Sequence, residues 1–166
     1  MTDPWLELSF LPRQHEWFKA GGWKLWVSQY PEIFDDNDKA NAAKQAPRGY
    51  YFREWLSAVT LFNRNGLRSL IGQYSSPKHT LNINRIAKIL PDAVIRVLTD
   101  KNQFGQTRPP DLFVYNNDCT DWFFAEVKGP GDYLRPNQIK MIQSLERVTE
   151  KPVRVIHLRK RTKRNR

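Results

Sequence analysis

Three charged side chains lie in a stretch that otherwise predicts two apolar strands joined by a turn. The stretch PPDLFVYNNDCTDWFFAEVKGP, residues 109–130, places Asp111 before LFVY and both Glu126 and Lys128 within WFFAEVK. Because side chains alternate along a strand, Glu126 and Lys128 point to the same face. A hairpin turned near residues 117–120 brings Asp111 close to Glu126. Two carboxylates and one ammonium group are therefore expected at one end of a sheet.

Such a pair of carboxylates suits a hard divalent cation. Close carboxylates raise each other's pKa unless a cation lies between them. Mg²⁺ or Mn²⁺ takes carboxylate, carbonyl and water oxygens, and the backbone carbonyl of Val127 offers a further oxygen. The ion lowers the pKa of water and stabilises a phosphorane-like transition state, while Lys128 orients the water or neutralises charge. This chemistry is phosphodiester hydrolysis; the alternative is that the three charges form salt bridges at strand ends.

The elements that position these residues are predicted from residue 50 onward. Apolar residues at helical spacing predict an amphipathic helix that is closed by Gly66, with Glu54 beside its apolar face. Asp118 and Asp121 are predicted as turn residues. Strands are predicted at 67–74, 93–99, 111–116, 122–128 and 152–158, and helices at 82–90 and 136–150. This order predicts an α/β fold with a central mixed sheet flanked by helices.

The second of these helices begins at Pro136, a residue that favours the first helical turn. Its apolar spacing predicts that Ile139, Ile142 and Leu145 face inward. Residues 101–110 are predicted as a loop that leads into the first strand of the hairpin.

The first 48 residues are predicted to form an accessory segment that packs on the core. They are rich in aromatic residues, which either stack on bases or pack against the core: Trp17, Phe18, Trp23 and Trp26. Residues 35–49 are polar and are predicted as a linker or surface loop. The predicted division is an accessory segment at 1–48, a nuclease-type domain at 49–158 and a basic tail at 159–166.

The charge of the chain favours a polyanionic partner such as DNA. The formal net charge is +10, from 27 basic and 17 acidic residues, and residues 159–166 alone carry six basic residues. The rest of the chain is mildly basic. The tail is either a solvated end or an arm that adds counterion release on DNA, through residues that include Arg159, Lys160 and Arg161.

Several other classes of protein are disfavoured. No apolar run is long enough to span a membrane, and the first residues lack a secretory signal pattern, which favours a cytoplasmic location. Cys119 is the only cysteine, so an internal disulfide and a cysteine-based zinc site are excluded. The three histidines, His15, His79 and His157, lack the spacing of zinc ligands. No glycine-rich phosphate loop is present.

The extended string around the three charges resembles the VRR-NUC domain of the PD-(D/E)xK nucleases, the catalytic domain of Fanconi-associated nucleases. The matching pieces are Pro110-Asp111, Glu126-Val127-Lys128-Gly129-Pro130, Asp132-Tyr133-Leu134 and Gln138. The resemblance implies a restriction-endonuclease-like fold and a DNA nuclease that uses Mg²⁺ or Mn²⁺. It also implies Glu54 as a further metal ligand and places Gln138 near the site, in contact with substrate or Lys128. Pro109 departs from the glycine that the family often carries there.

The resemblance further implies action on branched, flapped or junction DNA. Arg108, Arg135 and Lys140 are predicted to meet phosphates, although surface solvation explains each equally well. The open alternatives for function are an antibacterial DNase effector, secreted by a bacterium, and a non-catalytic DNA-binding module. A homodimer, an immunity protein and a repair protein are the open alternatives for a protein partner. A bacterial or phage origin is expected.

Overall fold

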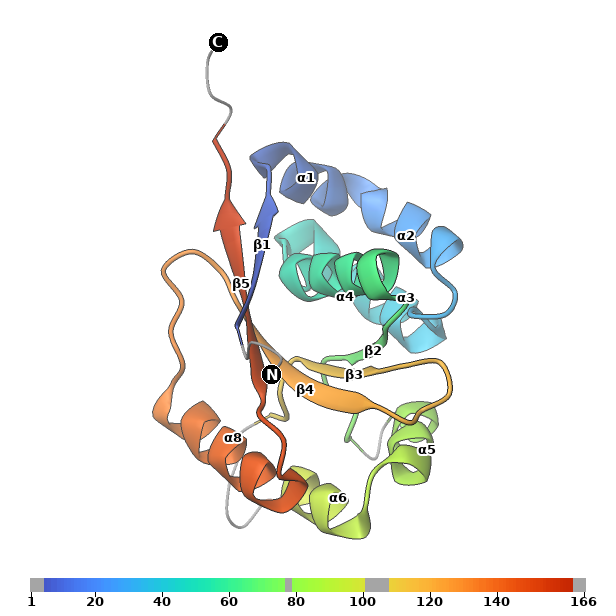
Figure 1. Ribbon diagram of the computed structural model, residues 1–166. Coiled ribbons are helices and arrows are strands. Elements are labelled where there is room, and N and C mark those ends of the chain that lie inside the picture. Colours follow the sequence, from blue (N-terminus) through green and yellow to red (C-terminus); the bar gives the residue numbers. More distant parts are fainter. Residues whose placement is uncertain (1–4, 77–78, 101–107, 163–166) are drawn as a thin grey trace.

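A five-stranded mixed sheet forms the centre of the molecule (Figure 1). The computed structural model describes residues 5–76, 79–100 and 108–162. Its strands are β1 (Trp5–Phe10), β2 (Arg68–Ile71), β3 (Leu112–Tyr115), β4 (Trp122–Lys128) and β5 (Arg154–Lys160). They follow the order β1-β5-β4-β3-β2, in which β1, β5 and β4 are parallel and β3 is antiparallel to both neighbours. The predicted α/β class with a central mixed sheet is confirmed.

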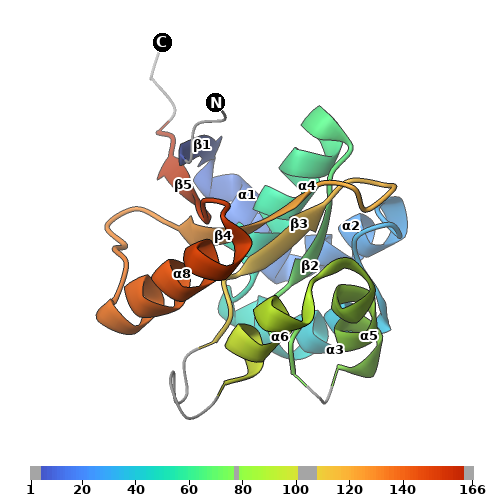
Figure 2. The same cartoon turned by 60° about the horizontal axis from the view of Figure 1, so that its bottom comes forward.

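Helices cover both faces of the sheet (Figures 1 and 2). One face carries α1 (Pro12–Trp17), α2 (Trp23–Gln29), α3 (Asp36–Gln45) and α4 (Phe52–Asn65), with a π-turn at Phe18–Gly22 and a 3-10 turn at Ala46–Arg48. The other carries α5 (Thr80–Ile89), α6 (Asp92–Thr99) and α8 (Pro136–Thr149). Each face of the sheet has its own hydrophobic core: the first core lies against α3 and α4, and the second core lies against α5, α6 and α8. Because side chains alternate along β3, Leu112 and Val114 pack in the first core, and Phe113 and Tyr115 pack in the second core.

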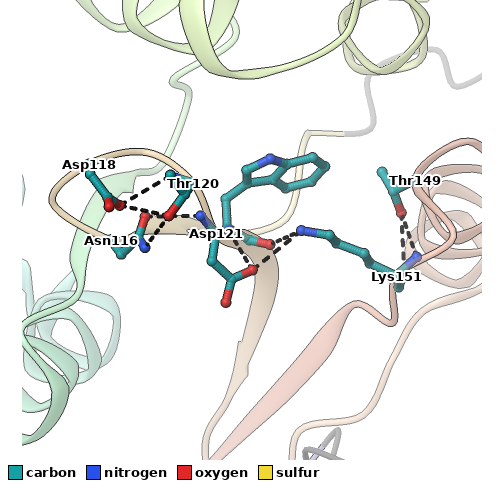
Figure 3. Close-up of polar contacts among 7 residues, drawn as sticks. Asn116, Asp118, Thr120, Asp121, Thr149 and Lys151 are labelled. Carbon is teal, nitrogen blue, oxygen red and sulfur yellow. Dashed lines mark hydrogen bonds and ion pairs between the residues drawn. The ribbon is translucent and has the colours of Figure 1, made fainter.

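The hairpin between β3 and β4 is closed by a network of polar contacts (Figure 3). Asp118 Oδ1 accepts hydrogen bonds from the Thr120 hydroxyl at 2.7 Å and from its backbone N–H at 3.3 Å, and Asp121 N donates to Asn116 Oδ1 at 3.0 Å. Lys151 Nζ donates to the carbonyl of Trp122 at 3.1 Å. The prediction that Asp118 and Asp121 are turn residues is confirmed.

The N-terminal aromatic residues pack against α4 rather than standing clear of it. Phe18 and Trp23 are buried, and both contact the buried Trp55 ring. Phe18 and Trp23 therefore pack on the core, whereas Trp17 remains partly exposed. The segment also adds β1, a strand that the sequence did not predict, beside β5. The division at residue 48 stays a prediction.

The prediction of a linker or surface loop at residues 35–49 is wrong, because α3 occupies most of this segment. Asp35 and Asp38 form a capping box in which Asp38 N donates to Asp35 Oδ1 and Asp35 N donates to Asp38 Oδ2, each at 3.0 Å. These bonds satisfy backbone groups that the first helical turn leaves unpaired. The small side chains of Ala42 and Ala46 are fully buried against the first core.

The prediction of a strand at residues 93–99 is also wrong, because this segment belongs to the helix α6. Its buried residues Val94 and Leu98 are one helical turn apart, and they pack in the second core, which also holds residues of α8. Tertiary burial has overridden the preference of β-branched residues for strands.

The remaining predicted elements are confirmed; β4 has the predicted ends, and the ends of the others are shifted. The strand predicted at 67–74 stops at Ile71, since Gly72 follows with a φ of +77°. The strand predicted at 152–158 runs instead from Arg154 to Lys160. In α8, Leu145 is buried and Ile142 partly buried as predicted, but Ile139 is exposed and Met141 is buried in its place.

Two predicted segments fall partly beyond the structure. Residues 101–107 of the predicted loop and residues 163–166 of the predicted tail lie outside the described residues. Within the ranges that are described, no helix has the length and apolar character needed to cross a membrane.

Candidate active site

The two predicted carboxylates meet where β3 begins and β4 ends. The register Leu112–Ala125 places Asp111 one residue beyond the last pair of the ladder, beside Glu126. The backbone N–H of Val127 donates to Asp111 Oδ2 at 2.8 Å. The side chain of Asp111 is therefore held against the end of β4.

The chain segment that leads into β3 is fixed by the end of β2. Gly72 N donates to the carbonyl of Asp111 at 2.9 Å, which extends the antiparallel pairing by one bond. The fully buried Tyr74 donates its hydroxyl hydrogen to the carbonyl of Pro110 at 2.8 Å. These bonds fix the backbone on both sides of the Asp111 side chain, so the position of its carboxylate is set by the sheet.

Lys128 and Glu126 face each other on one side of β4, as the alternation of a strand predicts. Lys128 Nζ lies 3.1 Å from Glu126 Oε1, and both side chains are almost completely buried. Gln138 of α8 joins the pair, since its Nε2 donates to Glu126 Oε1 at 2.5 Å and its Oε1 accepts from Lys128 Nζ at 3.1 Å. The backbone N–H of Arg135 also donates to Gln138 Oε1, at 3.0 Å. Gln138 therefore orients both charged groups.

Glu54 lies close enough to Asp111 for their charges to interact. Burial, followed by the negative charge of Asp111, raises the pKa of Glu54 to about 7, although Arg53 and Lys128 act in the opposite direction. The position beside the apolar face of α4 is the one that the sequence predicts for this residue.

Asp111 and Glu126 are likewise shifted towards their protonated forms. Burial, followed by the charge of Glu126, raises the pKa of Asp111 to about 7, while the Val127 N–H and Lys128 partly oppose the rise. Burial also raises the pKa of Glu126, against the ammonium group of Lys128. Glu126 is buried and Glu54 and Asp111 are partly buried, and three such carboxyl groups with raised pKa values around one pocket mark a functional site that favours an added cation.

Two adjoining pockets open onto these side chains. A pocket of about 320 Å³ contains Glu54, Asp111, Glu126, Lys128 and Gln138 in its lining. A wider pocket of about 720 Å³ shares Asp111, Glu126 and Gln138 with it and adds the exposed Arg108. Carboxylates and exposed arginines that line the same pockets are an arrangement that suits a metal ion and a phosphate.

The oxygen atoms of this site fit a hard divalent ion that retains water ligands. Within the described ranges, no three histidine, cysteine, aspartate or glutamate side chains are grouped so that they could together hold a metal ion. The carboxylates instead interact in pairs, Glu54 with Asp111 and Asp111 with Glu126. Mg²⁺ is commonly held by one or two carboxylates together with water and substrate phosphate, so the donor set suits it.

The predicted DNA-contacting residues separate into three groups. Arg108 and Arg135 line the wider pocket, whereas Lys140 is exposed on α8 and is not among the residues that line either pocket. Arg159 and Lys160 belong to β5, and the backbone N–H of Arg161 donates to Phe10 O at 2.8 Å. Arg159 also forms an ion pair with Glu7. Their contact with DNA stays a prediction.

Two positioning residues were not identified from the sequence. Arg53 Nη1 donates to Asp132 Oδ2 at 2.7 Å, and a Cβ added at Gly129 would overlap the guanidinium group of Arg53. The glycine in the EVKGP string therefore leaves room for the arginine side chain, which would have to move if a larger residue stood there. Tyr74 is predicted only as part of a strand, because its hydrogen bond to Pro110 joins residues far apart in the chain.

The fold and the site together define the class of the protein. A mixed sheet that presents paired carboxylates and a buried lysine from Glu126-Val127-Lys128 is the arrangement expected of a PD-(D/E)xK nuclease domain. Residues 54–161 match the VRR-NUC domain, and the match covers more than half of the chain. The chain belongs to the VRR-NUC domain family and carries a nuclease domain.

Comparison with solved structures finds similarity to paFAN1. The crystal structure of paFAN1 bound to 2nt 5'flap DNA with gap shares 24% identity, covers 68% of this chain and 21% of that chain, and gives a TM-score of 0.42. The crystal structure of paFAN1 bound to 1nt 5'flap DNA with gap shares 20% identity, covers 86% and 23%, and gives 0.39. This chain therefore spans about a fifth of the length of paFAN1. No curated protein matches the chain.

Proposed function

We propose that this chain is a divalent-metal-dependent DNA nuclease that hydrolyses phosphodiester bonds and acts selectively on branched, flapped or junction DNA. The observation that carries the proposal is the Lys128 ammonium group, which lies 3.1 Å from Glu126 Oε1 in a pocket that also contains Asp111. Membership of the VRR-NUC family supports the chemistry and the selectivity.

Asp111 and Glu126 are the proposed principal ligands of Mg²⁺ or Mn²⁺. Glu54 would hold the ion or one of its waters, and the backbone carbonyl of Val127 is the proposed further ligand. When bound, such an ion supplies Lewis-acid activation of water and of the phosphate. The protein supplies the position of the ligands, which the Val127 N–H and Gln138 fix.

Lys128 is proposed to contact the reacting phosphate or the attacking water. An ammonium group has three hydrogen-bond donors, and the contacts of Lys128 with Gln138 Oε1 and Glu126 Oε1 engage two of them. No other partner of this ammonium group is found among the described residues, and we propose that the third donor binds the substrate. Because the group is buried and held from two sides, its charge acts with little solvent screening on the charge that develops in the transition state.

The protonation of the carboxyl groups gives the proposed reaction a pH dependence. Burial and the repulsion of neighbouring carboxylates raise the pKa values of Glu54 and Asp111 to about 7. Metal binding requires the ionised forms, so protons compete with the metal below neutral pH. Cleavage at limiting metal is therefore expected to rise between about pH 6 and pH 8, and saturating metal should move this rise to lower pH.

The proposed function is tested by cleavage of a panel of DNA substrates with Mg²⁺ and with Mn²⁺. Plasmid, linear duplex, flapped and junction DNA are compared for the wild type and for Lys128→Met, with Lys88→Met as the control at an exposed lysine of α5. We expect the wild type and the control to cut branched substrates fastest, and Lys128→Met to be inactive but folded. Wild-type protein that binds DNA and cuts none of the panel with either ion would instead be a non-catalytic DNA-binding module.

A further inference from the structure

Tyr133 is an exposed aromatic side chain at the edge of the carboxylate site. At 77% exposure it is the most exposed large apolar side chain in the described residues. It lines both pockets that contain Asp111 and Glu126. Because the ring is open to water and lines the same pockets as the paired carboxylates, it is available to contact a ligand that enters them.

The loop that carries Tyr133 is fixed on both sides of the ring. Before it, Asp132 Oδ2 accepts hydrogen bonds from Gly129 N at 3.0 Å and from Arg53 Nη1 at 2.7 Å. After it, the backbone N–H of Arg135 donates to Gln138 Oε1 at 3.0 Å, and α8 begins at the next residue. The backbone that carries the ring is thus fixed on both sides, which lowers the conformational entropy that the loop loses when the ring binds a ligand.

The charges around the ring identify the kind of ligand. Arg108 and Arg135 are exposed and line the wider pocket together with Tyr133. A protein partner that covered the tyrosine would also have to desolvate these two arginines. A nucleic-acid strand satisfies both features, because its phosphates pair with guanidinium groups while its bases stack on aromatic rings.

We propose that Tyr133 is a stacking platform for a nucleobase that neighbours the phosphate held at Asp111 and Glu126. This inference rests on the proposed nuclease function, since that function places a phosphate in the pocket. A base can stack on the ring only after it leaves its stack in the duplex. The platform therefore binds an unpaired nucleotide next to the reacting phosphate and holds that phosphate in place.

The first test measures stacking without cleavage. Flap DNA that carries 2-aminopurine as the unpaired nucleotide is titrated with protein in EDTA, and quenching of its fluorescence reports stacking. We expect quenching with the wild type and with Tyr133→Phe, which keeps the ring. Tyr133→Ala should abolish the quenching and weaken binding by about 5- to 150-fold, the effect of losing one aromatic–base stack. Equal quenching by Tyr133→Ala would overturn the proposal.

The matched control is Tyr50→Ala. Tyr50 is also exposed, but it lies in the turn before α4 and is not among the residues that line either pocket. It should bind and quench as the wild type does. Because both tyrosines are exposed, neither substitution removes much buried surface, and thermal melting should show that all variants remain folded.

The second test combines the protein change with a change in the DNA. Removing the unpaired base to leave an abasic site should raise KM for the wild type, by about the same factor as Tyr133→Ala on intact DNA. Tyr133→Ala should then show no further rise on abasic DNA, with kcat nearly unchanged. If Tyr133→Ala and removal of the base each raised KM independently, so that the two factors multiplied, the proposal that the base stacks on Tyr133 would be refuted.

These outcomes separate the two proposals. If the wild type cuts DNA but Tyr133→Ala binds, quenches and cuts identically, the platform is refuted and the nuclease function stands. If the wild type cuts no DNA with any divalent ion, the nuclease function is refuted, and the quenching titration still decides whether a base stacks on Tyr133.

Discussion

Replacing Asp111 by asparagine should stabilise the fold while it removes activity. The pKa of Asp111 rises from its usual 3.8 to about 7, mainly through burial and then through the charge of Glu126. At about 1.4 kcal/mol per pH unit, this rise corresponds to at most roughly 4 kcal/mol of destabilisation once the group is ionised. Because Glu54 and Glu126 share the repulsion, we expect asparagine to recover about 1–3 kcal/mol at pH 8.

The direction in which stability changes with pH follows from the raised pKa of Asp111. A carboxyl group with a raised folded-state pKa contributes its full stability below pH 3.8 and loses it as the pH rises towards 7. Wild-type stability without metal should therefore fall between about pH 4 and pH 7, and the fall should be shallower in Asp111→Asn. Asparagine keeps an oxygen that can accept the Val127 N–H, so the local geometry is preserved.

The assay is thermal unfolding at pH 5 and pH 8, in EDTA and in MgCl₂. For a chain of this length, the expected gain at pH 8 raises Tm by about 3–10 °C. Mg²⁺ should raise the Tm of the wild type and leave that of Asp111→Asn almost unchanged, because a ligand stabilises only the state that binds it. Asp118→Asn is the control, since that carboxyl group is exposed in the hairpin turn and its pKa is lowered by its hydrogen bonds with Thr120.

Two results would show that the Asp111 carboxylate is not a destabilising metal ligand. One is an Asp111→Asn variant that is less stable than the wild type at pH 8 in EDTA, which would show that the carboxylate stabilises the fold. The other is an equal Mg²⁺-induced rise in Tm for both proteins, which would place the metal elsewhere.

Three further predictions concern the surroundings of the site. Gln138→Ala should lower kcat about 10- to 100-fold in steady-state cleavage assays, because Glu126 and Lys128 lose the group that orients them; an unchanged kcat would contradict this role. Gly129→Ala should displace Arg53 from Asp132, reduce cleavage and change stability by less than about 1 kcal/mol, since this ion pair is partly exposed; full activity would show that the loop needs no such fixing. Neutralising residues 159–161 with glutamine should weaken DNA binding and flatten its dependence on salt without changing kcat, and an unchanged salt slope would mean that these residues do not meet phosphates.

The parts of the fold that the sequence predicted are those whose signals are local. The hairpin of β3 and β4 combines apolar strands with a turn rich in Asn and Asp, and its strand β4 has the predicted limits. In α8, Pro136 at the start and the apolar spacing agree with each other. The approach of Asp111 to Glu126 followed from hairpin geometry alone, so the centre of the candidate site was also predictable.

The errors arise where distant contacts decide the structure. β1 pairs with β5 from the opposite end of the chain, and no local pattern in residues 5–10 indicates this partner. The β-branched residues of α6 favour a strand locally, but burial of Val94 and Leu98 in the second core selects the helix. The contacts of Arg53 with Asp132 and of Tyr74 with Pro110 likewise join residues that are distant in the sequence.

The central claim is that the carboxylate pair at Asp111 and Glu126 makes this domain a metal-dependent nuclease. The most direct measurement is the single-turnover cleavage rate of end-labelled flap DNA across a range of Mn²⁺ concentrations, for the wild type and for Glu126→Gln. We expect a saturable dependence on Mn²⁺ for the wild type, no cleavage in EDTA, and no cleavage by folded Glu126→Gln at any concentration. Cleavage by the wild type in EDTA, or a wild-type rate for Glu126→Gln, would contradict this claim.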